Sequence, residues 1–152
     1  MSDYIKIMRP SHWSKNVFVF AALLFGKKLF GPIDEVVVSI ASAIGAFICF
    51  SLAASAMYIV NDIIDRKADL LHPVKKNRPI ASGRLPVWHA LIFAGICAAA
   101  ALLGSFSMIY QFGFIILIYM ALSGFYSLAF KRMMIIDVII IAIGFVLRAV
   151  AG

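Results

Sequence analysis

The chain of 152 residues is 64% hydrophobic, only 14% of its residues are charged, and its mean hydropathy is +1.02. Soluble domains are about half apolar and about one-quarter charged, so the composition excludes an ordinary soluble domain and predicts a membrane protein. The formal charge of +7 would suit nucleic-acid binding. In so apolar a chain, however, cations are typical of cytoplasmic loops and of sites for anionic lipids or ligands, and we expect membrane lipids rather than nucleic acid as partners.

Five apolar segments along the chain predict an all-α fold, a polytopic bundle of transmembrane helices. A helix needs about 20 apolar residues to cross the hydrocarbon core. The uncharged run 36–60 is long enough for one crossing, and the uncharged run 85–130 is long enough for two, with a hairpin near 104–107. The predicted spans are 13–30, 36–60, 86–104, 107–130 and 133–152.

The predicted loops differ in positive charge. With a cytoplasmic N-terminus, 11 of the 14 Lys and Arg residues lie on the cytoplasmic side, Lys27 and Lys28 lie outside, and Arg148 lies within a span. In membrane proteins the excess of Lys and Arg lies in the cytoplasmic loops. The sequence therefore predicts a multi-pass protein of the cell (inner) membrane, with the N-terminus and the loop after the second span in the cytoplasm.

This cytoplasmic loop follows directly from the second span and contains charge of both signs in the stretch YIVNDIIDRKADLLHPVKKNRPIASG, residues 58–83. Asp62, Asp65 and Asp69 have the spacing i, i+3, i+7, which places three carboxylates on one face of a helix. Oxygen ligands without His or Cys suit Mg²⁺, which binds one or two carboxylates together with water and substrate phosphates. The pattern predicts that these aspartates bind Mg²⁺.

Four cations follow the aspartates, and they can bind the anionic groups of a diphosphate. They are Lys75, Lys76, Arg78 and Arg84. The acids and bases together indicate a magnesium–diphosphate site near the membrane surface. The alternative is a solvated loop that only sets topology, with the aspartates paired to Arg66, Lys67 or Arg78. That alternative does not explain why the acids share one helical face.

Three more cations lie beside or within predicted spans. Lys15 precedes most of the first span, Lys131 follows the fourth, and Arg148 shares a helical face with Asp137 in the fifth. Ionisable groups within spans usually face the protein interior or a water-filled cavity. Lys15 and Lys131 are therefore either phosphate ligands or orientation charges. Arg148 and Asp137 either line a substrate cavity or make structural contacts.

Several strings of residues resemble one family. NDIIDRKAD (61–69) resembles the first aspartate-rich motif of the UbiA-type intramembrane prenyltransferase superfamily, HPVKKNRPIASG (72–83) resembles the loop that follows it, and YSLAFKR (126–132) resembles the end of the family's fourth helix. MRPSHWSKN (8–16) and DVIIIAIGFVLRAVAG (137–152) are similar to one branch of it, the decaprenyl-phosphate phosphoribosyltransferases.

The resemblance implies about nine transmembrane helices around a cavity, of which about five would lie in this chain. It implies that Asp62, Asp65 and Asp69 are the catalytic metal ligands for Mg²⁺. It also implies a group of substrate-binding residues, with Asn61 shaping the site and the cations neutralising phosphates. This group comprises Lys15, Asn61, Lys75, Arg78, Lys131 and Arg148.

The branch implies a transferase that moves phosphoribose from phosphoribosyl pyrophosphate to polyprenyl (decaprenyl) phosphate and releases pyrophosphate, for cell-envelope glycan precursors. One alternative within the superfamily is prenyl transfer from a prenyl diphosphate to an aromatic acceptor. A second is an inactive fragment or a non-enzymatic membrane subunit. Because the superfamily's second aspartate-rich motif does not occur in residues 1–152, we expect the N-terminal part of a single domain, truncated at its C-terminus.

Overall fold

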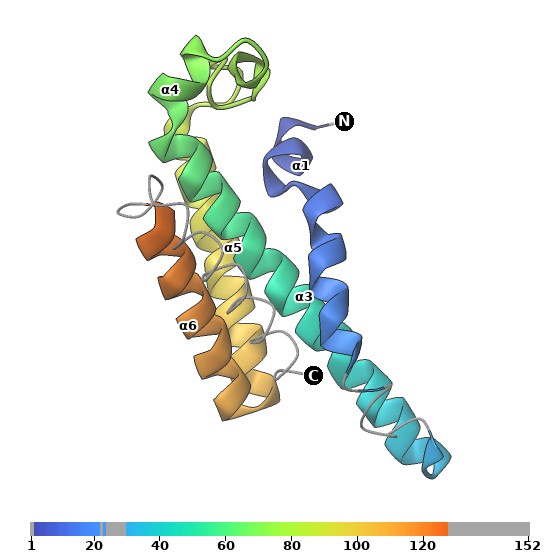
Figure 1. Cartoon of the computed structure of the whole chain (residues 1–152). Helices are drawn as coiled ribbons and strands as arrows, with labels where there is room; N and C mark the ends of the chain where they lie inside the picture. The colour runs from blue at the N-terminus through green and yellow to red at the C-terminus, as the bar shows by residue number, and fades with distance from the viewer. Residues whose placement is uncertain (1, 22, 24–29, 128–152) are drawn as a thin grey trace.

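The computed structural model describes residues 2–21, 23 and 30–127. Throughout these residues the regular elements are helical and no strand occurs, which confirms the all-α prediction (Figure 1). The elements in order are α1 (Asp3–Met8), the 3₁₀ helix η1 (Pro10–Phe20), α3 (Ile33–Ile64), α4 (Arg66–Leu71), the 3₁₀ turn η3 (Lys75–Asn77), α5 (Val87–Met108) and α6 (Tyr110–Phe125).

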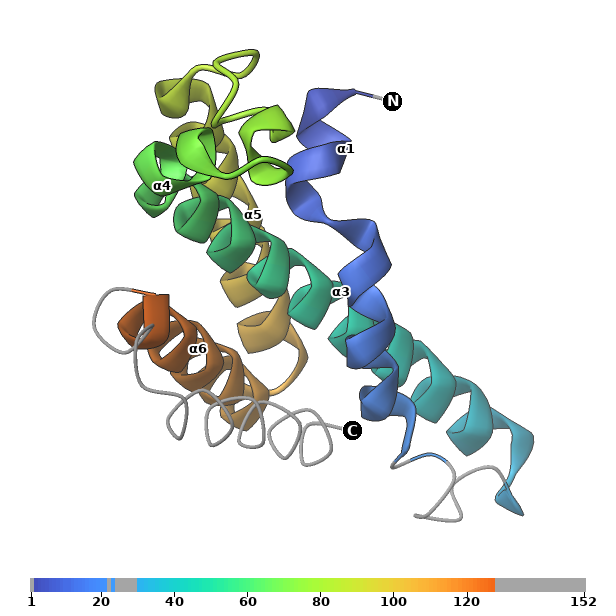
Figure 2. The same ribbon diagram turned by 45° about the horizontal axis from the view of Figure 1, so that its top comes forward.

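Helix α3 is the element on which the others are assembled. It has 32 residues, α5 and α6 pack against it as a hairpin, and η1 runs along it on another side (Figure 2). The hairpin turns at Ile109, whose backbone is extended (φ −149°, ψ 134°). The sequence predicted the turn near 104–107. These residues instead continue α5, and the hydroxyls of Ser105 and Ser107 donate to the carbonyls of Leu102 (3.0 Å) and Gly104 (2.8 Å).

Aromatic rings and small residues form the core between the long helices. The side chain of Phe50 on α3 is fully buried, and its ring contacts those of Phe112 (5.9 Å between centroids) and Tyr119 (5.5 Å) on α6. Buried alanines line the same cluster, including Ala53 on α3 and Ala101 on α5. Small side chains let helix backbones approach closely, as is usual within membranes.

Two of the described helices, α3 and α5, are long and apolar enough to cross a membrane, and α6 is a shorter apolar helix. Their outer faces expose large apolar side chains such as Ile48 and Ile96, which suits contact with lipid. The predicted first span lies only partly within the described residues, and the predicted fifth span (133–152) lies outside them.

The N-terminal segment is attached to α3 by polar contacts with two serines. Asn16 Nδ2 donates to Ser51 Oγ (3.1 Å), and Trp13 Nε1 donates to Ser55 Oγ (3.1 Å). The Ser55 hydroxyl also lies within hydrogen-bonding distance of the Met8 carbonyl (3.0 Å). These contacts bring the end of α1 to the last turns of α3.

The loop between η3 and α5 is compact because it closes on its own backbone. The N–H of Ser82 donates to the Arg78 carbonyl (2.8 Å), and the N–H of Leu85 donates to the Pro79 carbonyl (3.0 Å). Ile80 is buried with Ile7 and Ile59, which lie on α1 and α3. Gly83 turns the chain with φ 77°, a left-handed conformation that other residues adopt only at a cost.

We predict that Gly83→Ala destabilises the protein by about 1 kcal/mol, because an L residue is strained at this positive φ. Gly95→Ala is the matched control. A Cβ meets no atom within 4 Å at either position, but Gly95 lies within helix α5, where alanine is favoured over glycine. Thermal unfolding of the purified chain in detergent would show a lower midpoint for the first variant only. Equal midpoints would contradict the prediction.

Candidate functional site

Two of the three predicted aspartates are buried together where α3 gives way to α4. Asp62 lies in the last turn of α3 and Asp69 lies in α4, and each is only 3% exposed. The helix is interrupted at Asp65, but the chain keeps a helical path because Asp65 N–H donates to the Asn61 carbonyl (2.9 Å) and Asp69 N–H donates to the Asp65 carbonyl (2.8 Å). The shared face predicted from the spacing therefore persists for Asp62 and Asp69.

Arg78 links these two carboxylates. Its Nη1 donates to Asp62 Oδ1 (3.1 Å) and to Asp69 Oδ2 (2.6 Å). One guanidinium thus joins the end of α3 to α4. The backbone of Arg78 is also part of the compact loop before α5, where its carbonyl accepts from Ser82 N–H. Arg78 was among the predicted substrate-binding residues, and it was also a predicted partner of the aspartates in the topology alternative. The structure shows this pairing.

Arg9 provides a second guanidinium to the Asp62 carboxylate, and it is not among the residues predicted for the site. Its Nη2 donates to Asp62 Oδ1 at 2.5 Å, and its Cζ lies 5.3 Å from the centroid of the Tyr58 ring. The backbone of Arg9 is left-handed (φ 53°, ψ 61°) between α1 and η1. A separation of 53 positions from Asp62 gives no periodic signal, and only the motif MRPSHWSKN pointed to this segment.

His12 packs against the same tyrosine ring as Arg9. Its ring packs edge-on against Tyr58 (5.3 Å between centroids, 64°). Burial, and then the positive charges of Arg9 and Lys15, lower the pKa of His12 below its usual value. The lowered pKa favours the neutral imidazole, and the Arg9 guanidinium lies beside the same Tyr58 ring.

The side-chain oxygen of Asn61 is buried. Its Oδ1 has no hydrogen-bond partner among the described residues, whereas buried polar atoms are normally paired. With the carboxylates of Asp62, Asp65 and Asp69, the donor set consists of oxygen alone, which fits Mg²⁺. In the part of the chain that the structure describes, however, no three acidic, His or Cys side chains are already gathered around a metal position. Arginine nitrogens contact two of the aspartates instead.

The other predicted substrate-binding cations differ in position. Lys15 and Lys75 are exposed. Arg84, a cation of the same loop, is also exposed, and it donates to the Asn77 carbonyl (2.9 Å) and lies 3.5 Å from Asp3. Lys131 and Arg148 lie outside the described residues. The role of each of these cations stays a prediction.

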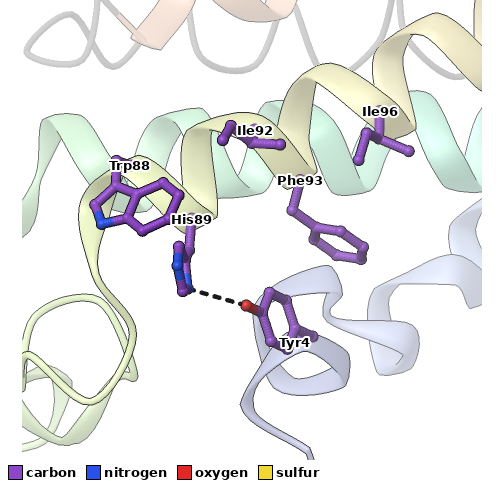
Figure 3. A pocket seen from close by; sticks show the side chains of 6 residues that line it. All are labelled: Tyr4, Trp88, His89, Ile92, Phe93 and Ile96. Atoms are coloured by element: carbon purple, nitrogen blue, oxygen red, sulfur yellow. Dashed lines mark hydrogen bonds between the residues drawn. The ribbon is translucent and has the colours of Figure 1, made fainter.

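A shallow groove of about 220 Å³ lies between α1 and the start of α5 (Figure 3). Its lining is mostly apolar and consists of Tyr4, Trp88, His89, Ile92, Phe93 and Ile96. Tyr4 Oη lies 3.2 Å from His89 Nδ1, and the Tyr4 ring packs edge-on against Phe93 (5.3 Å between centroids). The contacts of Tyr4 with His89 and Phe93 thus hold α1 against α5. Arg9 is the residue that follows α1.

The sequence is similar to that of a known family and of several named proteins. A profile of the UbiA prenyltransferase family matches residues 16–152. Decaprenyl-phosphate phosphoribosyltransferases are 37% identical over 153 residues in Mycolicibacterium smegmatis (100% of this chain, 48% of that protein) and 36% identical over 153 residues in Mycobacterium tuberculosis (100% and 50%). The enzyme of that name from Corynebacterium glutamicum is 39% identical over 154 residues (97% and 44%).

These matches confirm the resemblance carried by the aspartate-rich and N-terminal motifs. The chain spans about half the length of the curated relatives it matches. With the apolar helices α3 and α5, the family match identifies a helical membrane protein.

We predict that Asp69→Asn in metal-free buffer lowers the free energy of unfolding by about 2–3 kcal/mol, because it leaves the partly buried Arg78 without one of its two carboxylates. The control is Asp3→Asn. Asp3 pairs with Lys6 and Arg84 at 3.5 Å, where both cations are nearly half exposed, and such pairs contribute about 0.5 kcal/mol. Chemical denaturation in detergent would compare the two variants. An equal loss of free energy of unfolding in Asp69→Asn and Asp3→Asn would contradict a buried ion pair at Asp69.

Proposed function

Because the chain belongs to the UbiA prenyltransferase family, we propose that it forms the N-terminal part of a Mg²⁺-dependent intramembrane transferase that acts on a diphosphate substrate. The observation that carries this proposal is the buried cluster in which Asp62 and Asp69 meet two guanidiniums. Such a cluster holds the two kinds of group that a metal–diphosphate complex needs, namely carboxylates for the metal and arginines for the phosphate oxygens.

The residues present fit a magnesium ion. Asp62, Asp65 and Asp69 would hold it with the side-chain oxygen of Asn61, whose buried Oδ1 otherwise has no partner among the described residues. When bound, Mg²⁺ would neutralise charge on the departing diphosphate. Arg78 would orient the phosphate groups, since its planar guanidinium can bind two oxygens at once. Lys15, Lys75, Lys131 and Arg148 are proposed to add positive charge around the substrates.

The substrates we propose are phosphoribosyl pyrophosphate and a polyprenyl phosphate, such as decaprenyl phosphate. Relatives over essentially the whole chain are named as decaprenyl-phosphate phosphoribosyltransferases. In this reaction a phosphate oxygen of the lipid attacks C1 of the ribose, the bond from C1 to the pyrophosphate breaks, and pyrophosphate leaves. The attacking oxygen is already anionic, so the protein needs to position it rather than deprotonate it.

The proposed location of this site is the cytoplasmic mouth of a membrane-embedded cavity. The loop from Arg66 to Arg84 carries six of the chain's cations, and the positive-inside rule puts such a loop in the cytoplasm. A lipid phosphate in the inner membrane and a soluble phosphoribosyl donor would meet there. The lipid-linked phosphoribose would be a precursor for cell-envelope glycans.

Prenyl transfer from a prenyl diphosphate to an aromatic acceptor is the second candidate, because the family that matches residues 16–152 is one of prenyltransferases. It would use the same metal and diphosphate ligands. The two candidates differ in the group attached to the diphosphate.

We predict that the complete gene product that contains this chain releases pyrophosphate from phosphoribosyl pyrophosphate when given polyprenyl phosphate and Mg²⁺. Asp62→Asn and Asp65→Asn should each lower the rate at least about 100-fold, because each removes a charged ligand that stabilises the leaving group. Asp34→Asn is the control, since Asp34 is exposed in the first turn of α3, at the opposite end from the cluster.

Two results would contradict the proposal. Turnover of a prenyl diphosphate with an aromatic acid, without turnover of phosphoribosyl pyrophosphate, would favour the second candidate. Absence of both reactions, with unchanged Mg²⁺ binding in the Asp62 and Asp65 variants, would favour a non-enzymatic membrane protein.

A further inference from the structure

We propose that the Arg9 guanidinium pairs with the Asp62 carboxylate while no divalent cation is bound, and that a bound divalent cation displaces it. When the metal binds, the Arg9 guanidinium leaves Asp62 Oδ1 and becomes a donor to a phosphate oxygen of the substrate. This inference rests on the proposed function, because it assumes a metal–diphosphate site at the aspartates.

Two cations converge on a single carboxylate oxygen. Arg9 Nη2 and Arg78 Nη1 both donate to Asp62 Oδ1, at 2.5 Å and 3.1 Å. Two guanidiniums so close repel one another, and the contact is favourable only because buried carboxylates lie between them. Together they bring to Asp62 the same charge that one divalent cation brings.

The two arginines are held differently. Arg78 binds carboxylates on both α3 and α4, and its neighbours Pro79 and Ile80 are buried in the compact loop. Arg9 binds one oxygen, from a left-handed junction between two short elements. Moving Arg78 would break the link between the helices, whereas moving Arg9 breaks one ion pair. Arg9 is therefore the cation that the metal would displace.

The two arginines leave one buried acceptor of the cluster unused. Asn61 precedes Asp62 in the sequence. Its Oδ1 is buried and has no hydrogen-bond partner in the described part of the chain. A metal ion bound by Asn61 and Asp62 would satisfy this oxygen, which the present arrangement does not. The exchange therefore gains one buried polar interaction for the protein.

Once it leaves Asp62, Arg9 would donate to a bound diphosphate. Its side chain is 20% exposed and its guanidinium lies beside the Tyr58 ring, so it can keep that contact while its donors turn away from Asp62. A diphosphate held by the metal supplies anionic oxygens to receive them. Metal binding would thus free a donor for the substrate, and the two binding events would favour each other.

The test is Arg9→Gln in the complete protein, with Mn²⁺ as the metal probe and inorganic pyrophosphate as the anion probe. Mn²⁺ alone should bind about five- to tenfold more tightly to the variant, because its competitor is gone. Pyrophosphate in the presence of Mn²⁺ should bind at least about tenfold more weakly, because a donor is gone. Electron paramagnetic resonance would measure free Mn²⁺, and calorimetry would measure pyrophosphate binding. Lys67→Gln is the control for charge, since Lys67 is exposed near the same helix junction.

Exchange predicts that Arg9→Gln strengthens the binding of Mn²⁺ and weakens the binding of pyrophosphate. Weaker binding of both ligands to Arg9→Gln would mean that Arg9 only supports the fold, and unchanged binding of both would mean that it plays no part; either result overturns the inference while leaving the proposed function in place. If wild-type protein and Asp62→Asn bind Mn²⁺ equally, the proposed function fails as well.

A second measurement avoids any variant at Arg9. In wild-type protein labelled with ¹⁵N-arginine, the Nε resonance of Arg9 should shift when Mg²⁺ is added before any pyrophosphate. An unshifted resonance at saturating Mg²⁺ would overturn the inference.

Discussion

The carboxylate of Asp62 is the point on which the described structure depends. It receives guanidiniums from Arg9 near the N-terminus and from Arg78 after α4, so one buried charge connects three separate segments. Removing either partner from a buried charged cluster is costly, because the remaining charge is left without compensation. Under the proposed function, a metal and phosphate groups would replace some of these ion pairs.

The helices around this cluster serve to bring its members together. Helix α3 is long enough to cross the membrane and carries Asp62 in its last turn. Ser51 and Ser55 bind the N-terminal segment along α3, while Ile7, Ile59 and Ile80 from the three charged segments pack together. Apolar packing thus sets the positions at which oppositely charged side chains meet.

Periodicity in the sequence predicted the helical class, the run that became most of α3 and the common face of Asp62 and Asp69, because local spacing determines which side chains share a helix face. It did not identify Arg9, which reaches Asp62 through a left-handed residue and tertiary packing. Nor did composition locate the hairpin, since GSFS looks like a break but its serines bond back to their own helix. Contacts between distant segments have no periodic signature, so the second arginine required the structure.

The account is tested most directly by an experimental structure of the complete protein with Mn²⁺ and pyrophosphate bound. The anomalous signal of Mn²⁺ would locate the metal without reference to the side chains. The account predicts a peak in contact with the side-chain oxygens of Asp62 and Asn61, with the Arg9 guanidinium on pyrophosphate. A peak away from these oxygens, or Arg9 still paired with Asp62 beside bound metal and pyrophosphate, would contradict it.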